Sequence, residues 1–339
     1  MVAFCDNNPE LHGTMLFDVP VLAPAQLSAA SFDEICVASM YHPDIRLQLL
    51  RELRIPPRRI SLSPEFSRAS RSAAALRKRL QPAFAGLRTV GVPTSRDGWS
   101  LWRMKGSLTG RRAFVIGNGP SLRLEDLELL RSQREICLAS NQIYAAFDRT
   151  AWRPSYYAIE DPDSARRGHR DIARLVECPM LIRDRYRRLF HNHPQITYFT
   201  LHPPVPYPQR PKFSRNLLLG IHSGTTITYA LLQWAAWMGV ESVYLLGVDC
   251  SYFVDHSFDH QVYTREKGYR YDPSTQQNYF IPDYHRSGDV LIKPDIEAQR
   301  LAYVSAYENC HRRGLMKIFN ATRGGRLDVF DRVEFESLF

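Results

Sequence analysis

Residue types suited to nucleotide binding follow the apolar run AFVIG in this sequence. The turn GNGPS comes next and contains Gly117, Asn118, Gly119 and Ser121. The glycines let the backbone pass close to a ligand, the asparagine offers an amide, and Ser121 is placed to cap the acidic helix that follows. The motif lacks the GK[ST] of a Walker loop and the spacing of GxGxxG. A phosphate-binding turn and a tight, well-capped turn therefore both fit it.

Two further apolar runs end in polar residues. In ICLASNQIY, Asn141 and Gln142 follow a run of strand character, and two amides at a strand end suit base and ribose hydroxyls. An Asx-type turn is the alternative. In IHSGTTITYALLQWAAWMGVESVYLLGVD, Ser223 and Gly224 open a long predicted helix, and Asp249 ends the next predicted strand.

Candidate catalytic bases lie between that strand and the last long helix. This Tyr-rich, Gly-bearing stretch has the character of a lid and contains His256, His260 and His285. A histidine near its ordinary pKa can take a proton from an acceptor hydroxyl, although a loop histidine without a role fits each position equally well. His256 and His260 have i, i+4 spacing, but no accompanying carboxylate motif supports a metal site. We therefore predict no bound metal.

The elements that position these residues alternate between strand and helix from Arg111 to the end. This order predicts an α/β, doubly wound, mainly parallel Rossmann-like sheet. Ligands bind such sheets beyond the carboxyl ends of the strands. The residues expected at that edge are Gly117, Asn141, Asp161, Asp249 and Asn320.

The chain divides by pattern into three parts. Residues 1–66 read as βαβ and predict a smaller, truncated Rossmann-like α/β domain, to which we assign no ligand because no GxGxxG turn is present. Residues 67–109 are rich in Arg, Ala and Ser and predict a basic helical connector. Residues 110–339 form the main domain, with a lid insertion over about 250–292.

The composition limits the partners. The chain has 339 residues, and 44 Lys plus Arg against 35 Asp plus Glu give a formal net charge of +9. Nucleic acid, an anionic membrane surface and a phosphorylated donor all fit that sign. No nucleic-acid-binding pattern accompanies the charge, so we expect no nucleic acid partner; peripheral membrane contact ranks behind an ordinary solvated basic surface.

The expected location follows from the apolar runs. None approaches the roughly eighteen residues that cross a bilayer, and the first residues show no leader pattern. The sequence therefore predicts a cytoplasmic protein, or one at the inner face of the membrane.

The ordered motifs together resemble a known superfamily. GNGPSL, a strand ending in Asn-Gln, Ser-Gly opening an alanine-rich helix, and a strand ending in GVD are together similar to the bacterial sialyltransferases that use CMP-sialic acid. They also resemble the motility-associated transferases that put nonulosonic acids on flagellin and the pterin pyrophosphokinase-like family of archaea. FNATRGGRLDVF is similar to the last two groups. The resemblance covers about residues 110–330.

The resemblance implies roles for individual positions. It places the GNGPS turn against the CMP phosphate and ribose, and Asn141 and Ser223-Gly224 against the nucleotide. With the strand-end residues added, the candidate nucleotide contacts are Gly117, Asn118, Gly119, Ser121, Asn141, Gln142, Asp161, Ser223, Gly224, Asp249, Tyr252 and Asn320.

Some positions depart from the family pattern. Asp161 stands where the sialyltransferases have a third asparagine, and Tyr252 lacks the spacing of their phosphate-contacting tyrosines. Their base is a histidine in a mobile segment before the last helix, which by order matches His285, with His260 as the second choice.

The resemblance implies a glycosyltransferase that moves a CMP-activated acidic sugar, sialic-acid-like or Kdo-like, to a glycan acceptor in surface polysaccharide or glycoconjugate biosynthesis. No cofactor is expected beyond this donor substrate, and a homo-oligomer stays open. The alternatives are a pterin-type pyrophosphokinase using ATP and Mg²⁺ held by Asp249, Asp161 and Glu160, and an inactive scaffold in a polysaccharide assembly complex.

Overall fold

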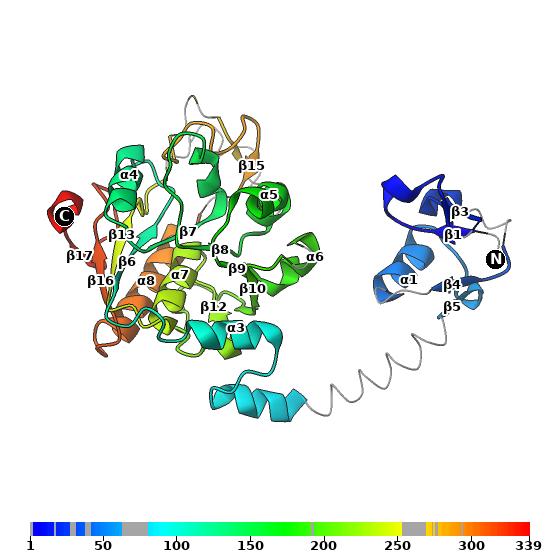
Figure 1. Ribbon diagram of the computed structural model, residues 1–339, viewed down its shortest axis with the longest axis horizontal. Coiled ribbons are helices and arrows are strands. Elements are labelled where there is room, and N and C mark those ends of the chain that lie inside the picture. Colours follow the sequence, from blue (N-terminus) through cyan, green and yellow to red (C-terminus); the bar gives the residue numbers. More distant parts are fainter. Residues whose placement is uncertain are drawn as a thin grey trace. The chain divides into compact units, whose positions relative to one another are not determined.

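The computed structural model divides the chain into two compact units, residues 1–84 and 85–339. It describes residues 3–16, 18–27, 32–37, 42–62, 81–190, 193–252, 269–272, 274, 277–292 and 294–339. Figure 1 shows each unit as a separate α/β body. The division falls after Phe84, inside the predicted connector, and residues 81–89 of that connector are helical.

The first unit contains the predicted βαβ pattern. Strand β4 (Ile35–Val37), helix α1 (His42–Arg51) and strand β5 (Ile60–Leu62) follow one another, and the two strands pair in parallel. Strand β3 (Val19–Leu22) pairs in parallel with β1 (Phe4–Cys5) and antiparallel with β2 (Met15–Leu16). Val37, Leu49 and Ile55 form its small buried core.

The second unit is built on one large sheet with every neighbouring pair parallel. Its strands, in spatial order, are β10 (Ile196–Phe199), β9 (Met180–Arg183), β8 (Tyr156–Ile159), β7 (Cys137–Ser140), β6 (Arg112–Ile116), β13 (Ser242–Leu246), β16 (Lys317–Asn320) and β17 (Asp331–Arg332). This confirms the predicted Rossmann-like fold class.

Helices cover both faces of this sheet, as the doubly wound prediction requires (Figure 1). One face packs against α3 (Arg96–Met104), α7 (Ile227–Trp237) and α8 (Ile296–Cys310), and the other against α4 (Leu124–Ser132), α5 (Pro162–Leu175) and α6 (Arg187–Phe190). Alternate residues of each strand feed the two cores, since Ala113 and Val115 face one while Phe114 and Ile116 face the other.

The chain order reverses direction at β6. The chain adds β7 and then β8 on one side of β6, whereas the later strands β13 and β16 lie on the other side of β6. This is the topological switch point at which doubly wound sheets bind ligands. The switch point is at the ends of β6 and β13. Ile116 and Leu246 pair there, and Gly117 and Gly247 are the first residues after the two strands.

Several elements were not predicted or begin elsewhere. Helix α5 was missed, and its first residue Pro162 follows an Asp161 side chain that caps the helix. Helix α7 begins at Ile227, with Thr226 as its N-cap, so Ser223 and Gly224 precede the helix rather than open it. Two small pairs, β11 (Leu201–His202) with β12 (Ile221–His222) and β14 (Tyr269–Arg270) with β15 (Val290–Leu291), complete the unit. Within the described residues, no helix is long and apolar enough to cross a membrane.

Candidate functional site

The GNGPS turn lies against the end of the neighbouring strand β13. The Gly117 amide donates to the Leu246 carbonyl at 2.7 Å, and the Gly119 amide donates to the Gly247 carbonyl at 2.9 Å. A Cβ on Gly117 would lie 2.2 Å from the Gly247 oxygen, and one on Gly119 would lie 1.9 Å from an Asp249 carboxylate oxygen. Both glycines are therefore required by packing inside the protein, and their two amides are already used.

Ser121 does not cap the helix that follows, which corrects the sequence prediction. Its hydroxyl donates to Asp249 Oδ2 at 2.8 Å, and the cap of α4 comes instead from Asp126, whose carboxylate accepts from the Arg123 amide at 3.1 Å. Asp249 is 8% exposed, and burial raises the pKa of its carboxyl while the bond from Ser121 lowers it. Ser121 and Asp249 thus fasten the turn to the β13 end.

The asparagines of the two motifs lie beside one another. Asn118 Nδ2 donates to the Ser140 carbonyl at 3.3 Å, which brings this amide to the end of β7. The next residue, Asn141, is left-handed with φ of 53°. Asn118 Oδ1 and Asn141 Oδ1 are both buried and have no hydrogen-bond partner in the described part of the chain. At the adjoining ends of β6 and β7, two buried side-chain oxygens therefore accept no hydrogen bond from the described residues.

Glu160 supplies a third such acceptor, at the end of β8 next to β7. It is 8% exposed, and its Oε2 is buried without a partner among the described residues. Burial, followed by the charge of Asp161, raises the pKa of Glu160 to about 7, and Arg183 opposes them. Unpaired buried acceptors are costly unless a ligand or water supplies donors. The ends of β6, β7 and β8 therefore point to a ligand rich in hydrogen-bond donors.

The second half of the predicted lid packs onto these strand ends. The Phe280 amide donates to the Asn118 carbonyl at 3.2 Å, and the Gln142 amide donates to the Tyr284 hydroxyl at 3.2 Å. Tyr279 stacks on Tyr284 with ring centroids 4.3 Å apart. Residues 279–285 thus bridge the GNGPS turn and the Asn141-Gln142 loop, a contact that brings together positions more than a hundred residues apart in sequence.

His285 lies within this covering segment. Its Nδ1 is 3.2 Å from the Gln142 side-chain nitrogen, and its ring packs at right angles to Tyr279 and Tyr284. Because an amide nitrogen can only donate, Nδ1 accepts and the proton of the neutral ring is on Nε2. A role as base would require that hydrogen bond to open.

The electrostatics around His285 keep the ring neutral. Burial, and then Arg167, lower its pKa to about 4, while Asp289 and Asp161 act in the opposite direction. Asp289 lies 3.8 Å from Nδ1 but is itself paired with Arg167 at 3.0 Å. The predicted His256 and His260 lie outside the described residues.

The other predicted contacts have partners within the fold. Gly224 is needed because a Cβ there would lie 2.6 Å from the Tyr229 ring and 2.7 Å from Ala302 Cβ. Ser223 is buried, and its Oγ accepts from the Thr225 amide at 3.4 Å. Asn320 is 1% exposed, donates to the Leu327 carbonyl at 2.9 Å and accepts from the Thr322 amide at 3.0 Å. Tyr252 is 37% exposed after the β13 end.

The carboxylates of the kinase alternative do not gather. Asp161 accepts from the Ser164 amide at 2.6 Å as the cap of α5, and Asp249 is bound to Ser121. Among the described residues, no group of three or more His, Cys, Asp or Glu side chains could hold a metal ion. Glu160 is the one member of the predicted trio whose carboxylate has a buried oxygen without a partner in this part of the chain.

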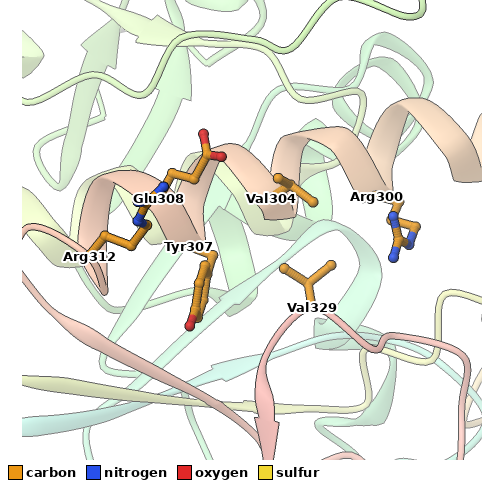
Figure 2. Close-up of a pocket in the computed structure, with 6 residues that line it drawn as sticks. All are labelled: Arg300, Val304, Tyr307, Glu308, Arg312 and Val329. Carbon is orange, nitrogen blue, oxygen red and sulfur yellow. The ribbon is translucent and has the colours of Figure 1, made fainter.

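A hollow of about 460 Å³ lies elsewhere, along the outer side of α8 (Figure 2). Its lining residues are Arg300, Val304, Tyr307, Glu308, Arg312 and Val329. Arg300 is paired with Asp328 at 3.1 Å and Glu308 with Arg210 at 2.7 Å. Because Arg300 and Glu308 are already paired and none of the buried acceptors without partners lines the hollow, we place the candidate site at β6, β7 and β8.

Comparison with family models finds a match to part of the chain. Residues 100–255 match the family described as 6-hydroxymethylpterin diphosphokinase MptE-like. The matched segment contains the GNGPS turn and the strand ending in GVD, and it is similar to the pterin pyrophosphokinase-like group that these motifs resemble. No curated protein sequence matches the chain.

The solved structures that match include a glycosyltransferase of low sequence identity. It is titled "Structure of MAf glycosyltransferase from Magnetospirillum magneticum AMB-1", with a TM-score of 0.43 and 15% identity over 91% of this chain and 54% of that chain. The present chain thus spans about half the length of that protein. At this similarity, the likeness says nothing about activity.

Proposed function

We propose that this protein is a glycosyltransferase that transfers a CMP-activated acidic sugar, sialic-acid-like or Kdo-like, to a glycan acceptor in surface polysaccharide or glycoconjugate synthesis. The observation that carries the proposal is the set of buried acceptors without donors on Asn118, Asn141 and Glu160. They lie at the carboxyl ends of three adjacent strands beside the switch point, where doubly wound sheets bind nucleotides.

The chemistry of these acceptors selects the part of the nucleotide that they contact. A phosphate offers only acceptor oxygens at neutral pH, whereas ribose hydroxyls and the exocyclic amino group of cytosine are donors. The nucleoside, not the phosphate, therefore fits against Asn118, Asn141 and Glu160. Uracil has a carbonyl where cytosine has its amino group, so the same acceptors favour cytidine over uridine.

The transfer itself requires little from the protein beyond position and charge stabilisation. Binding donor and acceptor together supplies much of the rate enhancement, and a CMP leaving group needs donors to meet its developing charge. A base must take the proton of the attacking acceptor hydroxyl as the new glycosidic bond forms and the bond to CMP breaks. His285 and His260 stay the predicted bases.

A pterin-type pyrophosphokinase is the second candidate, and the description of the matched family favours it. It would transfer a diphosphate from ATP with Mg²⁺. Asp249 and Asp161 are engaged by Ser121 and the α5 amide, which leaves Glu160 alone among the carboxylates proposed for the metal. We therefore rank it second. An inactive scaffold is the third candidate and would bind no nucleotide.

Calorimetric titration of the purified chain with CMP, UMP, UDP, GDP and ATP separates these candidates. We expect CMP to bind at least about ten-fold more tightly than UMP, because uridine leaves one buried acceptor unmatched. A chelator should leave CMP binding unchanged. Preference for UDP or GDP would exclude the CMP assignment, chelator-sensitive ATP binding would favour the kinase, and no binding of any nucleotide would favour the scaffold.

A further inference from the structure

Two tryptophans stand exposed on the outer side of helix α3. Trp99 is 50% exposed and Trp102 is 46% exposed, and their rings pack edge to face with centroids 5.7 Å apart. The opposite side of the helix is held by the fold, since Leu101 is buried and its carbonyl accepts from the Trp237 indole at 2.7 Å. Large aromatic pairs rarely remain this exposed on a soluble surface without a partner.

The tryptophans belong to a longer apolar stretch. Five large apolar side chains that are more than a third exposed lie within 16 residues, namely Leu87, Val90, Val92, Trp99 and Trp102. The nearby turn Leu217–Leu219 adds Leu219, which is 41% exposed. We call the exposed side chains of Trp99 and Trp102, together with those of Leu87, Val90 and Val92 that precede them in sequence, the tryptophan patch.

Basic residues accompany the tryptophan patch. Residues 85–106 contain Arg88, Arg96, Arg103 and Lys105 and a single acidic residue, Asp97. The Asp97 carboxylate is paired with Arg187 at 2.6 Å and also accepts from the Tyr198 amide, so it faces the fold. Arg96 and Arg103 are exposed and lie three and four residues from Trp99, on the same side of the helix.

From this combination, we propose that the tryptophan patch docks on an anionic lipid bilayer. Tryptophan is favoured at the level of lipid headgroups, and neighbouring arginines attract anionic lipids. A second copy of the chain is a poorer occupant, because a symmetric contact would bring Arg96 and Arg103 against the same residues of its partner.

The patch lies away from the candidate site. Helix α7 begins near the carboxyl ends of the strands and runs back across the sheet, so Trp237, its last residue, marks the amino edge. The α3 end contacts that residue, as the Gly106 amide donates to the Trp237 carbonyl at 3.0 Å. Figure 1 shows α3 and the strand β15, which follows the covering segment in sequence, at opposite ends of the unit. A protein docked through α3 would hold its strand-end site facing away from the bilayer.

Vesicle binding by the full chain tests this proposal. The probes are phosphatidylcholine vesicles with and without phosphatidylglycerol, followed by co-sedimentation and by quenching of tryptophan fluorescence with brominated lipid. We expect binding only to the anionic vesicles, weakened by salt. Trp99→Ser/Trp102→Ser should weaken it at least about ten-fold, and Arg96→Gln/Arg103→Gln roughly thirty-fold.

A matched control and four contrary outcomes make the test decisive. Ile292→Ser removes another exposed apolar side chain, 68% exposed, directly after β15 and outside the tryptophan patch, and should leave binding unchanged. Absence of binding, or binding that the tryptophan variant retains, overturns the proposal. The proposal is also overturned if the wild-type chain is a dimer and the tryptophan variant is a monomer, because the patch would then bind a second copy of the chain. If acrylamide fails to quench the fluorescence of Trp99 and Trp102 in the absence of vesicles, another part of the same chain covers the tryptophan patch.

Discussion

Two neighbouring parts of the strand edge differ in how their polar groups are used. Where β6 and β13 end, the amides of Gly117 and Gly119, the Ser121 hydroxyl and the Asp249 carboxylate bind one another or adjacent backbone. Where β6, β7 and β8 end, oxygens of Asn118, Asn141 and Glu160 are buried without partners in the described residues. The first part is complete in itself, whereas the second requires an added donor.

This difference separates packing from recognition within one short motif. The glycines of GNGPS are needed because β13 passes within contact distance, so their presence alone indicates no ligand. Asn118, between them, leaves its amide oxygen unused. A ligand is therefore expected to contact the asparagine side of the turn and to depend on the glycines only through the fold.

The largest expected effect is on turnover. His285→Ala should lower turnover by roughly two to four orders of magnitude and leave CMP affinity near wild type, if the ring takes the acceptor proton. His285→Gln, which keeps more of the buried volume, should do the same. Steady-state kinetics with CMP titration on the same samples would measure both quantities.

The pH dependence and a second histidine give the contrary outcomes. Since only the neutral ring accepts a proton and the His285 pKa is lowered to about 4, the wild-type rate should fall as the pH decreases through that value. Gln142→Ala frees Nδ1 and should cost less than about ten-fold in turnover. Near-normal turnover in His285→Ala with none in His260→Ala would make His260 the base.

Next in size is the glycine side of the comparison. Gly117→Ala should lower the free energy of unfolding by about 3 kcal/mol, because its Cβ would meet the Gly247 backbone. For a unit of this size, that is a fall in Tm of roughly 6–12 °C. Gly86→Ala is the control, since nothing lies within 4 Å of its added Cβ in a helical stretch. An unchanged Tm in Gly117→Ala would contradict the close packing.

The sequence predicted the fold better than the site. Short apolar runs such as AFVIG and MKIFNAT mark the strands clearly, and their alternation with helices defines a doubly wound sheet. Helix α5 was missed because it is highly polar, with Ala165, Gly168 and Ile172 as its main buried positions. The Asp161-Pro162 pair, a capping residue followed by proline at the first helical position, was the available signal.

The site was hidden by contacts distant in sequence. Ser121 reads as a helix cap until Asp249, 128 residues later, is seen to accept its hydroxyl. Likewise, Gln142 meets His285 across 143 residues. Glu160 could be named only as a carboxylate at a strand end, because its missing partner is a property of the packed structure. The local sequence pattern predicts where strands end, but it does not predict which polar groups at those ends have hydrogen-bond partners.

A smaller effect distinguishes Asn118 from Ser121. Asn118→Ala should weaken CMP binding about ten-fold, because it deletes an acceptor that has no partner without ligand. It also removes the long hydrogen bond to the Ser140 carbonyl, so Tm should fall by no more than a few degrees. Ser121→Ala should do the reverse and lower the free energy of unfolding by about 1 kcal/mol through the lost bond to Asp249. Calorimetry measures the CMP affinity of both variants, and thermal melts measure their Tm. Equal losses of affinity would place a ligand on both sides of the turn.

The last expected effect concerns the proton bound by Glu160. Its pKa is raised in the folded protein from 4.5 to about 7, so the unfolded chain loses this proton at lower pH. The contribution of Glu160 to stability is therefore full below pH 4.5 and is lost as the pH rises to about 7. Glu160→Gln should raise Tm above pH 7 and change it little near pH 4.5.

Ligand binding extends this argument to the site itself. A nucleoside that donates hydrogen bonds to the Glu160 carboxylate stabilises its charged form and lowers its pKa. CMP binding near pH 7 should then release a fraction of a proton, which is measured by comparing binding enthalpies in buffers of different ionisation enthalpy. Glu160→Gln should abolish the release, while Ser121→Ala should retain it. Proton uptake on binding, or a release that survives in Glu160→Gln, would show that the ligand does not donate to this carboxylate.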